Sequence, residues 1–359
     1  MAFHAYVSEK VDTAVFECGI GGEYDSTNII VSPSVTAVTS LGIDHVAMLG
    51  STLPEIAWHK GGIFKPGAPA FTAPQPEEAL TVLRQRAAER NADLTVVQQH
   101  PEVDGIKLGL QADFQKVNAS LAIAVAAAHL RKLGYNNVPD PSSPNASPLP
   151  LKFRRGLEQV KWPGRCQIRR EPQSKIMWHI DGGHTLESIE VAGQWFASSI
   201  TSNTSAKPSS GTHRPRILLF NQQTRESAAL AKALHTTLAT ALTKASETNE
   251  HPFTHAVFCT NITYLQGGYK ADLTSINTNK DDVEALTVQN GLAKTWAEID
   301  PQTQVNVVKT VQEAIEWCRQ IAGQHSNDEN VDVLVTGSLH LVGGVLEVLE
   351  GQAEQIAQQ

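Results

Sequence analysis

Cysteine is scarce in this sequence, and its few cysteines lie far apart. The 359 residues contain four, at Cys18, Cys166, Cys259 and Cys318. No Cys-x-x-Cys pair and no cysteine–histidine spacing typical of a metal site is present, which argues against a disulfide framework and against a zinc finger. Isolated thiols of this kind indicate reduced, structural cysteines in a reducing compartment.

The sequence also lacks an excess of positive charge and a long apolar run. Its 29 Lys and Arg residues face 37 Asp and Glu residues, which gives a net charge of −8 and a pI of about 5.9. This balance argues against a nucleic-acid-binding surface. No run approaches the ~18 apolar residues that a membrane span needs. The first residues, MAFHAYVSEKVD, lack the charge and apolar pattern of a targeting peptide, so we expect none in this chain.

What the sequence does contain is an alternation of apolar, β-rich runs and helical patterns. Its composition, 41% hydrophobic and 18% charged, is typical of a globular protein, and its length predicts two domains. Strands that alternate with helices predict an α/β fold with mostly parallel sheets. The expected strands are 11–16, 35–39, 68–72, 94–97, 176–180, 217–220, 256–258, 305–308 and 333–335. The expected helices are 52–60, 76–90, 111–133, 186–199, 227–242, 283–296, 311–321 and 342–349, with loops at 134–150, 207–215 and 265–281.

Three blocks in the first part of the chain carry residues suited to chemistry: FECGIGGEYDSTN, LGIDH and IAWHKGGIFKPG. The first expected strand ends in Glu17 and a glycine-rich turn, and the second leads to Asp44 and His45. Ligands bind at the carboxyl edge of open α/β sheets, so we expect the two strand ends to bring Glu17 and His45 together. Lys60 is expected at the end of the following helix, where Gly61–Gly62 stop it.

Each of these residues also has a structural interpretation. A glutamate before glycines is often a loop carboxylate, a histidine after an aspartate is often a capping residue, and glycine-rich turns also occur where no phosphate binds. Lys60 in the last turn of a helix is a cation that the helix dipole favours. Asn118, beside the apolar positions of the expected helix 111–133, needs a partner, which another helix can supply as well as a ligand.

The second half of the chain carries four further motifs: KWPGR, DGGHTLES, ILLFN and LVTGSLHLVGGVL. Asp181 and Ser338 each follow an expected strand and precede an expected helix. A carboxylate there suits ribose hydroxyls, and backbone N–H groups there suit a carboxylate ligand. The strand after WPGR begins a fresh α/β pattern, so we place the domain boundary at this motif.

Taken in order, these blocks resemble those of the eukaryotic folylpolyglutamate synthases, a family of ATP-dependent amide ligases in the superfamily of the Mur ligases. The resemblance covers nearly the whole chain. One departure is large: no Gly-Lys-Ser or Gly-Lys-Thr occurs in the sequence. The GxxGKGS-type phosphate-binding loop of the family lies upstream of the first block by more residues than this chain has there. We therefore expect a chain without the N-terminal segment of the family.

The resemblance implies a fold, a cellular location and an oligomeric state. Residues 1–164 are expected to form a truncated P-loop-NTPase-like domain, the central domain of a Mur ligase. Residues 165–359 are expected to form a Rossmann-like C-terminal glutamate ligase domain. A cytoplasmic monomer is expected, with a mitochondrial location open for a full-length form.

The resemblance also implies a role for matching residues in the first domain. Glu17 and His45 match magnesium ligands. Lys60 matches a catalytic lysine that reacts with CO₂ to form a carbamate, and Asn118 matches an asparagine that faces the adenine. Glu23 stands where bacterial relatives commonly have arginine, and we give it no role.

Four matching residues lie in the second domain. Arg165 matches an arginine that reaches the nucleotide phosphates, for which a guanidinium has suitable geometry. Asp181 matches a ribose ligand, and His184 lies near the reacting end of the nucleotide as a catalytic residue. Ser338 matches a residue that holds glutamate.

The implied activity is ATP-dependent addition of L-glutamate to the γ-carboxylate of tetrahydrofolate through an acyl phosphate, which builds polyglutamates. The substrates would be tetrahydrofolate, L-glutamate and ATP, with Mg²⁺ to neutralise phosphate charge. The alternative is a truncated, non-catalytic remnant, or the translation of an incomplete gene model, that cannot bind ATP productively.

Overall fold

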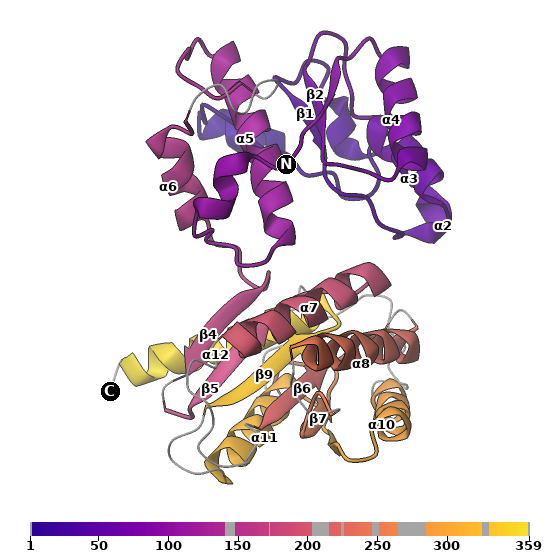
Figure 1. Cartoon of the computed structure of the whole chain (residues 1–359), viewed down its shortest axis with the longest axis vertical. Coiled ribbons are helices and arrows are strands. Elements are labelled where there is room, and N and C mark those ends of the chain that lie inside the picture. Colours follow the sequence, from indigo (N-terminus) through magenta and orange to yellow (C-terminus); the bar gives the residue numbers. More distant parts are fainter. Residues whose placement is uncertain are drawn as a thin grey trace. The chain divides into compact units, whose positions relative to one another are not determined.

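The computed structural model describes residues 2–140, 148–171, 173–202, 215–223, 226–245, 251–264, 285–324 and 330–357 (Figure 1). The chain folds as two compact units, which we describe separately. The first comprises Met1–Gly109 and Asp113–Val160, and the second comprises Leu110–Ala112 and Lys161–Gln359. Both units contain parallel strands covered by helices, which confirms the predicted α/β class.

A small parallel sheet, in the order β1-β2-β3, forms the centre of the first unit (Figure 1). The strands are β1 (Thr36–Val38), β2 (Ala70–Thr72) and β3 (Leu94–Val96). The helices are α1 (Ala2–Ser8), η1 (Ser26–Ile29), α2 (Val46–Leu49), α3 (Leu53–Gly61), α4 (Glu77–Glu89), η2 (Pro101–Gly105), α5 (Phe114–Lys132) and α6 (Leu151–Gln159). Because side chains alternate along a strand, Ala70 and Phe71 point to opposite faces of the sheet. Ala70 packs with α3 and α4, whereas Phe71 packs with α5.

The predicted strand at 11–16 is wrong. No described strand pairs with this segment. Within the described residues, β1 pairs with β2 alone, so its other edge has no strand beside it. The Val15 side chain is 86% exposed. Phe16 instead packs on α1, where its ring stacks on Phe3 with centroids 4.7 Å apart and meets Tyr6 edge-on. A β-rich run forms a strand only where a neighbouring strand offers it hydrogen bonds, and local sequence does not specify that neighbour.

The second unit is built on a six-stranded sheet in the order β4-β5-β9-β6-β7-β8 (Figure 1). The strands are β4 (Gln167–Glu171), β5 (Ile176–Ile180), β6 (Arg216–Phe220), β7 (His255–Phe258), β8 (Gln304–Val307) and β9 (Val331–Thr336). All pairs are parallel except β4 with β5. The helices are α7 (Leu186–Ser202), α8 (Ser227–Lys244), α10 (Thr287–Ile299), α11 (Val311–Gln324) and α12 (Leu339–Ala357).

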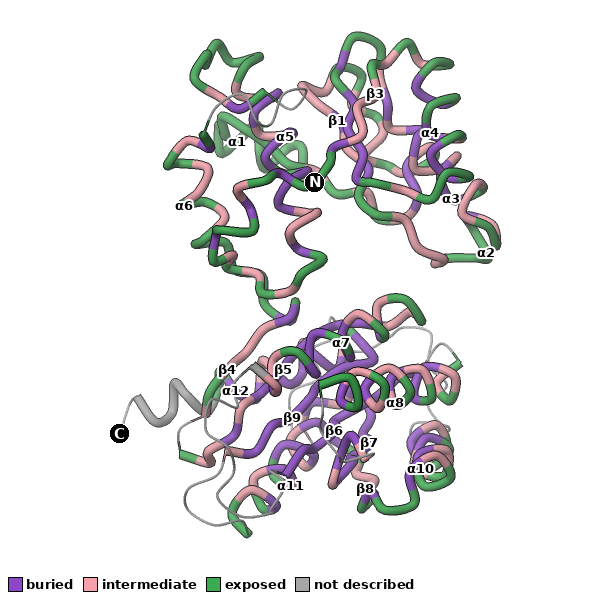
Figure 2. Tube along the Cα trace, viewed as in Figure 1, coloured by how far each residue is buried: buried purple, intermediate pink, exposed green. Residues whose placement is uncertain are grey.

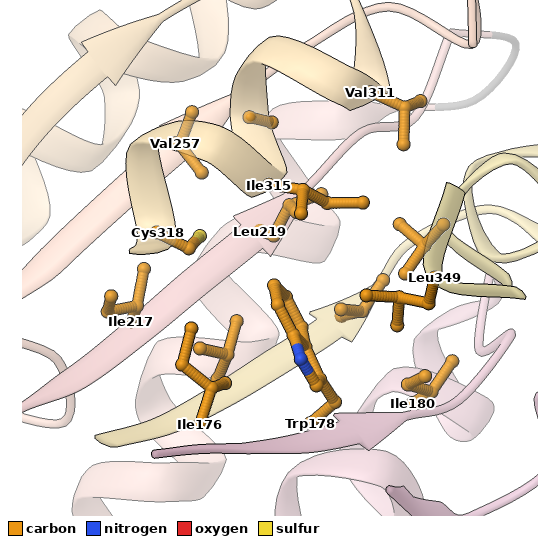
Figure 3. Packing of buried hydrophobic residues seen from close by; sticks show 14 of the residues in the cluster. Ile176, Trp178, Ile180, Ile217, Leu219, Val257, Val311, Ile315, Cys318 and Leu349 are labelled. Atoms are coloured by element: carbon orange, nitrogen blue, oxygen red, sulfur yellow. The ribbon is translucent and has the colours of Figure 1, made fainter. Parts of the chain in front are cut away.

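Helices cover both faces of this sheet, and the inner strands β5, β9, β6 and β7 are purple, or buried, along most of their length, whereas the edge strands β4 and β8 are not (Figure 2). On one face, Trp178 of β5 and Leu219 of β6 pack with α11 and α12 (Figure 3). On the other face, Leu218 and Phe220 of β6 pack with α7, α8 and α10. Neighbouring residues of β6 thus enter different clusters, as the alternation of a strand requires.

Most of the predicted elements are confirmed with shifts of a few residues at their ends. The strand 176–180 has the predicted bounds, and the helix 52–60 appears as α3 with Thr52 as its N-cap. The predicted loops at 207–215 and 265–281 lie almost entirely outside the described residues. Among the described residues, no helix is both long and apolar enough for a membrane span.

Candidate active site

In the first unit, the glycine-rich turn after Glu17 is closed by one aspartate. Asp25 Oδ2 accepts hydrogen bonds from the N–H groups of Gly19 and Ile20, at 2.8 and 3.1 Å. Its Oδ1 accepts from the backbone N–H and the hydroxyl of Thr27. Although desolvation opposes the effect, these donors together hold the pKa of Asp25 below its usual value. The turn is therefore organised around a carboxylate that stays ionised.

This turn packs directly on the C-terminal end of α3. Gly21 has a φ of +69°, and a Cβ on Gly22 would lie 2.7 Å from the Ile63 side chain and 2.9 Å from the His59 carbonyl oxygen. Only glycine allows this approach. Glu23 N–H donates to the same His59 carbonyl at 2.8 Å. The structure thus brings the first and third sequence blocks into contact, beside Lys60.

The side chain of Glu23, to which we assign no role from the sequence, anchors the turn. It accepts hydrogen bonds from Arg86 of α4 and from Arg90, the C-cap of that helix, with Arg90 Nη2 2.7 Å from Oε1. Arg86 also lies over the Trp58 ring, 4.4 Å from its centroid. A signal existed in the sequence: two arginines four residues apart on one helix face call for an acidic partner.

The four candidate residues of the first unit are placed as follows. Glu17 is exposed and follows no strand, so the argument that two strand ends bring it to His45 is wrong. His45 is also exposed and has a φ of +52° at the start of α2. Lys60 is half-buried in the last turn of α3. Asn118 donates to Gln115 Oε1 at 3.0 Å, so its partner lies on its own helix.

A metal site with three or more protein ligands is not formed within the described parts of the chain, since no three His, Cys, Asp or Glu side chains gather there. Magnesium commonly takes one or two protein oxygens and completes its shell with water and phosphate. One carboxylate and one imidazole, both exposed, are compatible with such a shell.

In the second unit, three motifs meet at the carboxyl edge of β5 and β9. Asp181 follows β5, and its Oδ2 and Oδ1 accept from the N–H groups of Cys166 and Gly183, each at 2.9 Å. Gly182 N–H donates to the Gly164 carbonyl at 3.0 Å, and Gly337 N–H donates to the Gly183 carbonyl at 3.0 Å. KWPGR, DGGHT and TGSLH are therefore linked chiefly through their backbones.

Two glycines in these segments lie so close to α12 that neither position has room for a side chain. A Cβ on Gly164 would lie 2.3 Å from Val342, and a Cβ on Gly182 would lie 2.2 Å from Leu339. Both contacts involve the first turns of α12. Arg165, next to Gly164, is exposed at this edge.

Burial changes the acid–base properties of Asp181 and Cys166. Desolvation raises the pKa of Asp181 above its usual value, against the opposing hydrogen bonds from Cys166 and Gly183. Desolvation and the neighbouring Asp181 raise the pKa of the Cys166 thiol, so it stays protonated and unreactive. Asp181 Oδ2 accepts from both the N–H and the thiol of Cys166, whereas Oδ1 accepts from Gly183 N–H alone and retains a further lone pair.

His184 and Ser338 are held by the turns that contain them. His184 Nδ1 lies 2.9 Å from the Gly182 carbonyl oxygen, which can only accept, so Nδ1 carries the proton. Its Nε2 is then the basic atom of the ring. Ser338 Oγ accepts from His340 N–H at 3.2 Å and so caps α12. The N-termini of α7 and α12 thus follow neighbouring strands at one edge, where helix dipoles favour anions.

Comparisons with known proteins show what this chain is similar to. Residues 164–348 match the family model described as "Dihydrofolate synthetase, C-terminal domain". The chain is 43% identical over 352 residues to the folylpolyglutamate synthase of Neurospora crassa, covering 98% of this chain and 63% of that protein. The chain thus spans less than two thirds of the length of the curated relatives it matches.

Solved structures share the fold. The folylpolyglutamate synthase of Mycobacterium tuberculosis, complexed with ADP and AMPPCP, matches with a TM-score of 0.66 at 22% identity, over 97% of this chain and 70% of that one. The bifunctional folylpolyglutamate synthase/dihydrofolate synthase of Yersinia pestis, complexed with AMPPNP and a manganese ion, matches with a TM-score of 0.64 at 20% identity, over 97% and 69%. The chain therefore belongs to the folylpolyglutamate synthase family, and the model of the dihydrofolate synthetase C-terminal domain matches most of its second unit.

Proposed function

We propose that the protein is an ATP-dependent ligase that adds L-glutamate to the γ-carboxylate of tetrahydrofolate. The observation that carries the proposal is the meeting of KWPGR, DGGHT and TGSLH at one sheet edge, in a chain 43% identical to a folylpolyglutamate synthase. In this reaction the γ-phosphoryl group of ATP passes to the folate carboxylate and ADP leaves. The amine of glutamate then attacks the acyl phosphate, loses a proton and displaces phosphate.

In the second unit, each candidate residue has a task that its environment supports. Exposed Arg165 would contact nucleotide phosphates through its guanidinium. Asp181 would accept from a ribose hydroxyl with the remaining lone pair of Oδ1. His184, with Nε2 as its basic atom, would accept a proton or hydrogen bond near the reacting amine. The start of α12 at Ser338 would hold a glutamate carboxylate.

In the first unit, Glu17 and His45 would hold magnesium, which when bound neutralises phosphate charge. Lys60 would carry a carbamate, which turns a cation into an anion. No described residue forms an ion pair with Lys60. Asn118 would face the adenine. Accordingly, we assign residues 1–164 to ATP binding and residues 165–359 to glutamate ligation, in a cytoplasmic monomer.

The experiment is an assay of ATP-dependent addition of labelled glutamate to tetrahydrofolate, with sedimentation to test the monomer. Arg165→Ala is expected to raise the KM for MgATP at least tenfold, because a charged contact to phosphate is lost. Arg155→Ala, exposed on α6, serves as the control and is expected to leave KM unchanged. Product formation that needs no ATP, or none in any preparation of folded protein, would contradict the proposal.

A further inference from the structure

Both backbone polar groups of Gly337, in the turn between β9 and α12, are hydrogen-bonded. Its N–H donates to the Gly183 carbonyl at 3.0 Å, and its carbonyl accepts from Gln222 Nε2 at 2.8 Å. Gly337 has a φ of +104°, and a Cβ there would lie 2.6 Å from the Asn221 carbonyl oxygen. No other residue type fits this position without displacing the turn.

The bond from Gln222 sets the direction of the next peptide N–H. The described peptide bonds are all trans, so the Ser338 N–H points opposite to the Gly337 carbonyl, and therefore away from Gln222. No described residue accepts a hydrogen bond from this N–H. The hydroxyl oxygen of Ser338 accepts from His340 N–H, which holds it at the start of α12. The backbone N–H of Ser338 is thus a donor that this turn presents to a ligand.

Behind Gln222 lies a cluster of buried amides. Asn221 Nδ2 donates to Asn261 Oδ1 at 2.8 Å, and Asn221 Oδ1 accepts from Gln289 Nε2 at 2.8 Å. Asn221 and Gln289 are fully buried, and Gln222 is 4% exposed. The cluster joins the segments after β6 and β7 to α10. It fixes the backbone from which the Gln222 side chain reaches Gly337.

We propose that Gln222 is a positioning residue that orients the Ser338 N–H toward the carboxylate of glutamate. This inference rests on the proposed function. A carbonyl oxygen cannot donate, so the amide NH₂ of Gln222 must face Gly337. Without this donor the Gly337 carbonyl becomes a buried, unpaired acceptor, and the turn rotates to expose it to water.

The first test measures the turn itself and needs no catalysis. Gln222→Met keeps the length of the side chain and removes the donor. Hydrogen exchange of the full chain, followed at Gly337, is expected to become at least tenfold faster in this variant. Thr303→Val is the matched control, because it removes a buried side-chain bond to the Phe253 carbonyl in the same unit. After correction for global stability, the control should leave Gly337 exchange within twofold of the wild type.

The second test measures glutamate use in the ligation assay. Gln222→Met is expected to raise the KM for glutamate about tenfold, with kcat and the KM for MgATP within threefold. Thr303→Val should change none of these. Unchanged Gly337 exchange, or faster exchange with an unchanged KM for glutamate, would overturn the role of Gln222. If the wild type shows no ligation, the proposed function is overturned, and with it the role of Gln222 toward glutamate. Hydrogen exchange at Gly337 would still decide whether Gln222 holds the turn.

Discussion

The two units of the chain bury their apolar side chains to different extents. The second has two large core clusters, one on each face of a six-stranded sheet. The first has three small clusters around a three-stranded sheet. Among described residues, all large hydrophobic side chains that are exposed belong to the first unit, except Trp162, Leu186 and Leu339. Since burial of apolar area contributes about 25 cal/mol per Å², the second unit is expected to be more stable.

The largest expected effect is in the core of the second unit. Trp178→Ala removes a fully buried ring between β5 and α12 and should lower the free energy of unfolding by about 3–5 kcal/mol. Urea unfolding followed by circular dichroism measures it. Trp162→Ala, at a side chain 61% exposed, should cost less than about 0.5 kcal/mol. Equal losses of unfolding free energy in both variants would contradict the argument that apolar burial makes the second unit more stable.

A second prediction concerns the chemistry assigned to the first unit. Lys60→Ala should lower turnover about 100-fold, equivalent to about 2.7 kcal/mol, because a preorganised charge near the phosphates is lost. The unfolding midpoint should change little, since Lys60 is only half-buried. Lys152→Ala, exposed on α6, is the control and should retain full activity. Full activity of Lys60→Ala would refute its proposed carbamate.

A third prediction concerns how much ion pairs, rather than the small apolar core, contribute to the stability of the first unit. Glu23→Gln leaves Arg86, whose side chain is 8% exposed, with Glu89, 42% exposed, as its remaining carboxylate partner. We expect a loss of about 2 kcal/mol, below that of a fully buried pair because Arg90 is 26% exposed. Glu77→Gln breaks the exposed pair with Arg84 and should cost less than about 0.5 kcal/mol. Similar losses in both variants, measured by urea unfolding, would show that the anchor contributes nothing.

The smallest effect is a pH dependence in the second unit. Burial lowers the pKa of His235, although Asp300 beside it acts in the opposite direction. A depressed pKa means that the unfolded chain binds the proton more tightly, so stability is present above about pH 6.5 and is lost as the pH falls. His235→Asn should make this decline shallower by no more than about 1 kcal/mol between pH 7 and pH 5. His4→Asn in exposed α1 should not change the slope.

The fold was predictable where burial dominates the sequence. The strand 176–180 is an apolar run on a sheet covered on both faces, and it was found with its observed bounds. β4, with the sequence QIRRE, was missed because an edge strand that is half-exposed carries no apolar run. The segment 11–16 has strand propensity but no strand partner among the described residues. Pairing is a long-range property, which local patterns do not contain.

The candidate site was predictable only in part for the same reason. That Asp181 and Ser338 follow strands was evident from the apolar runs before them, and the structure confirms it. The bond from Gln222 to Gly337 joins residues 115 positions apart, and no spacing rule reaches so far. Glu23 was passed over because its arginine partners lie 63 and 67 residues away. The functional roles of the candidates stay predictions.

The links among Gly164, Gly182, Gly183 and Gly337 have a consequence for how the protein would respond to its surroundings. They are bonds between uncharged amide and carbonyl groups, so neither pH nor ionic strength in the ordinary range alters them. The Arg165 guanidinium displayed on this frame is a charged, exposed group, and salt screens its attraction to an anion. A change in salt concentration would therefore change the affinity for an anionic ligand while these backbone links stay the same, so a salt profile reports on the charged side chain rather than on the frame.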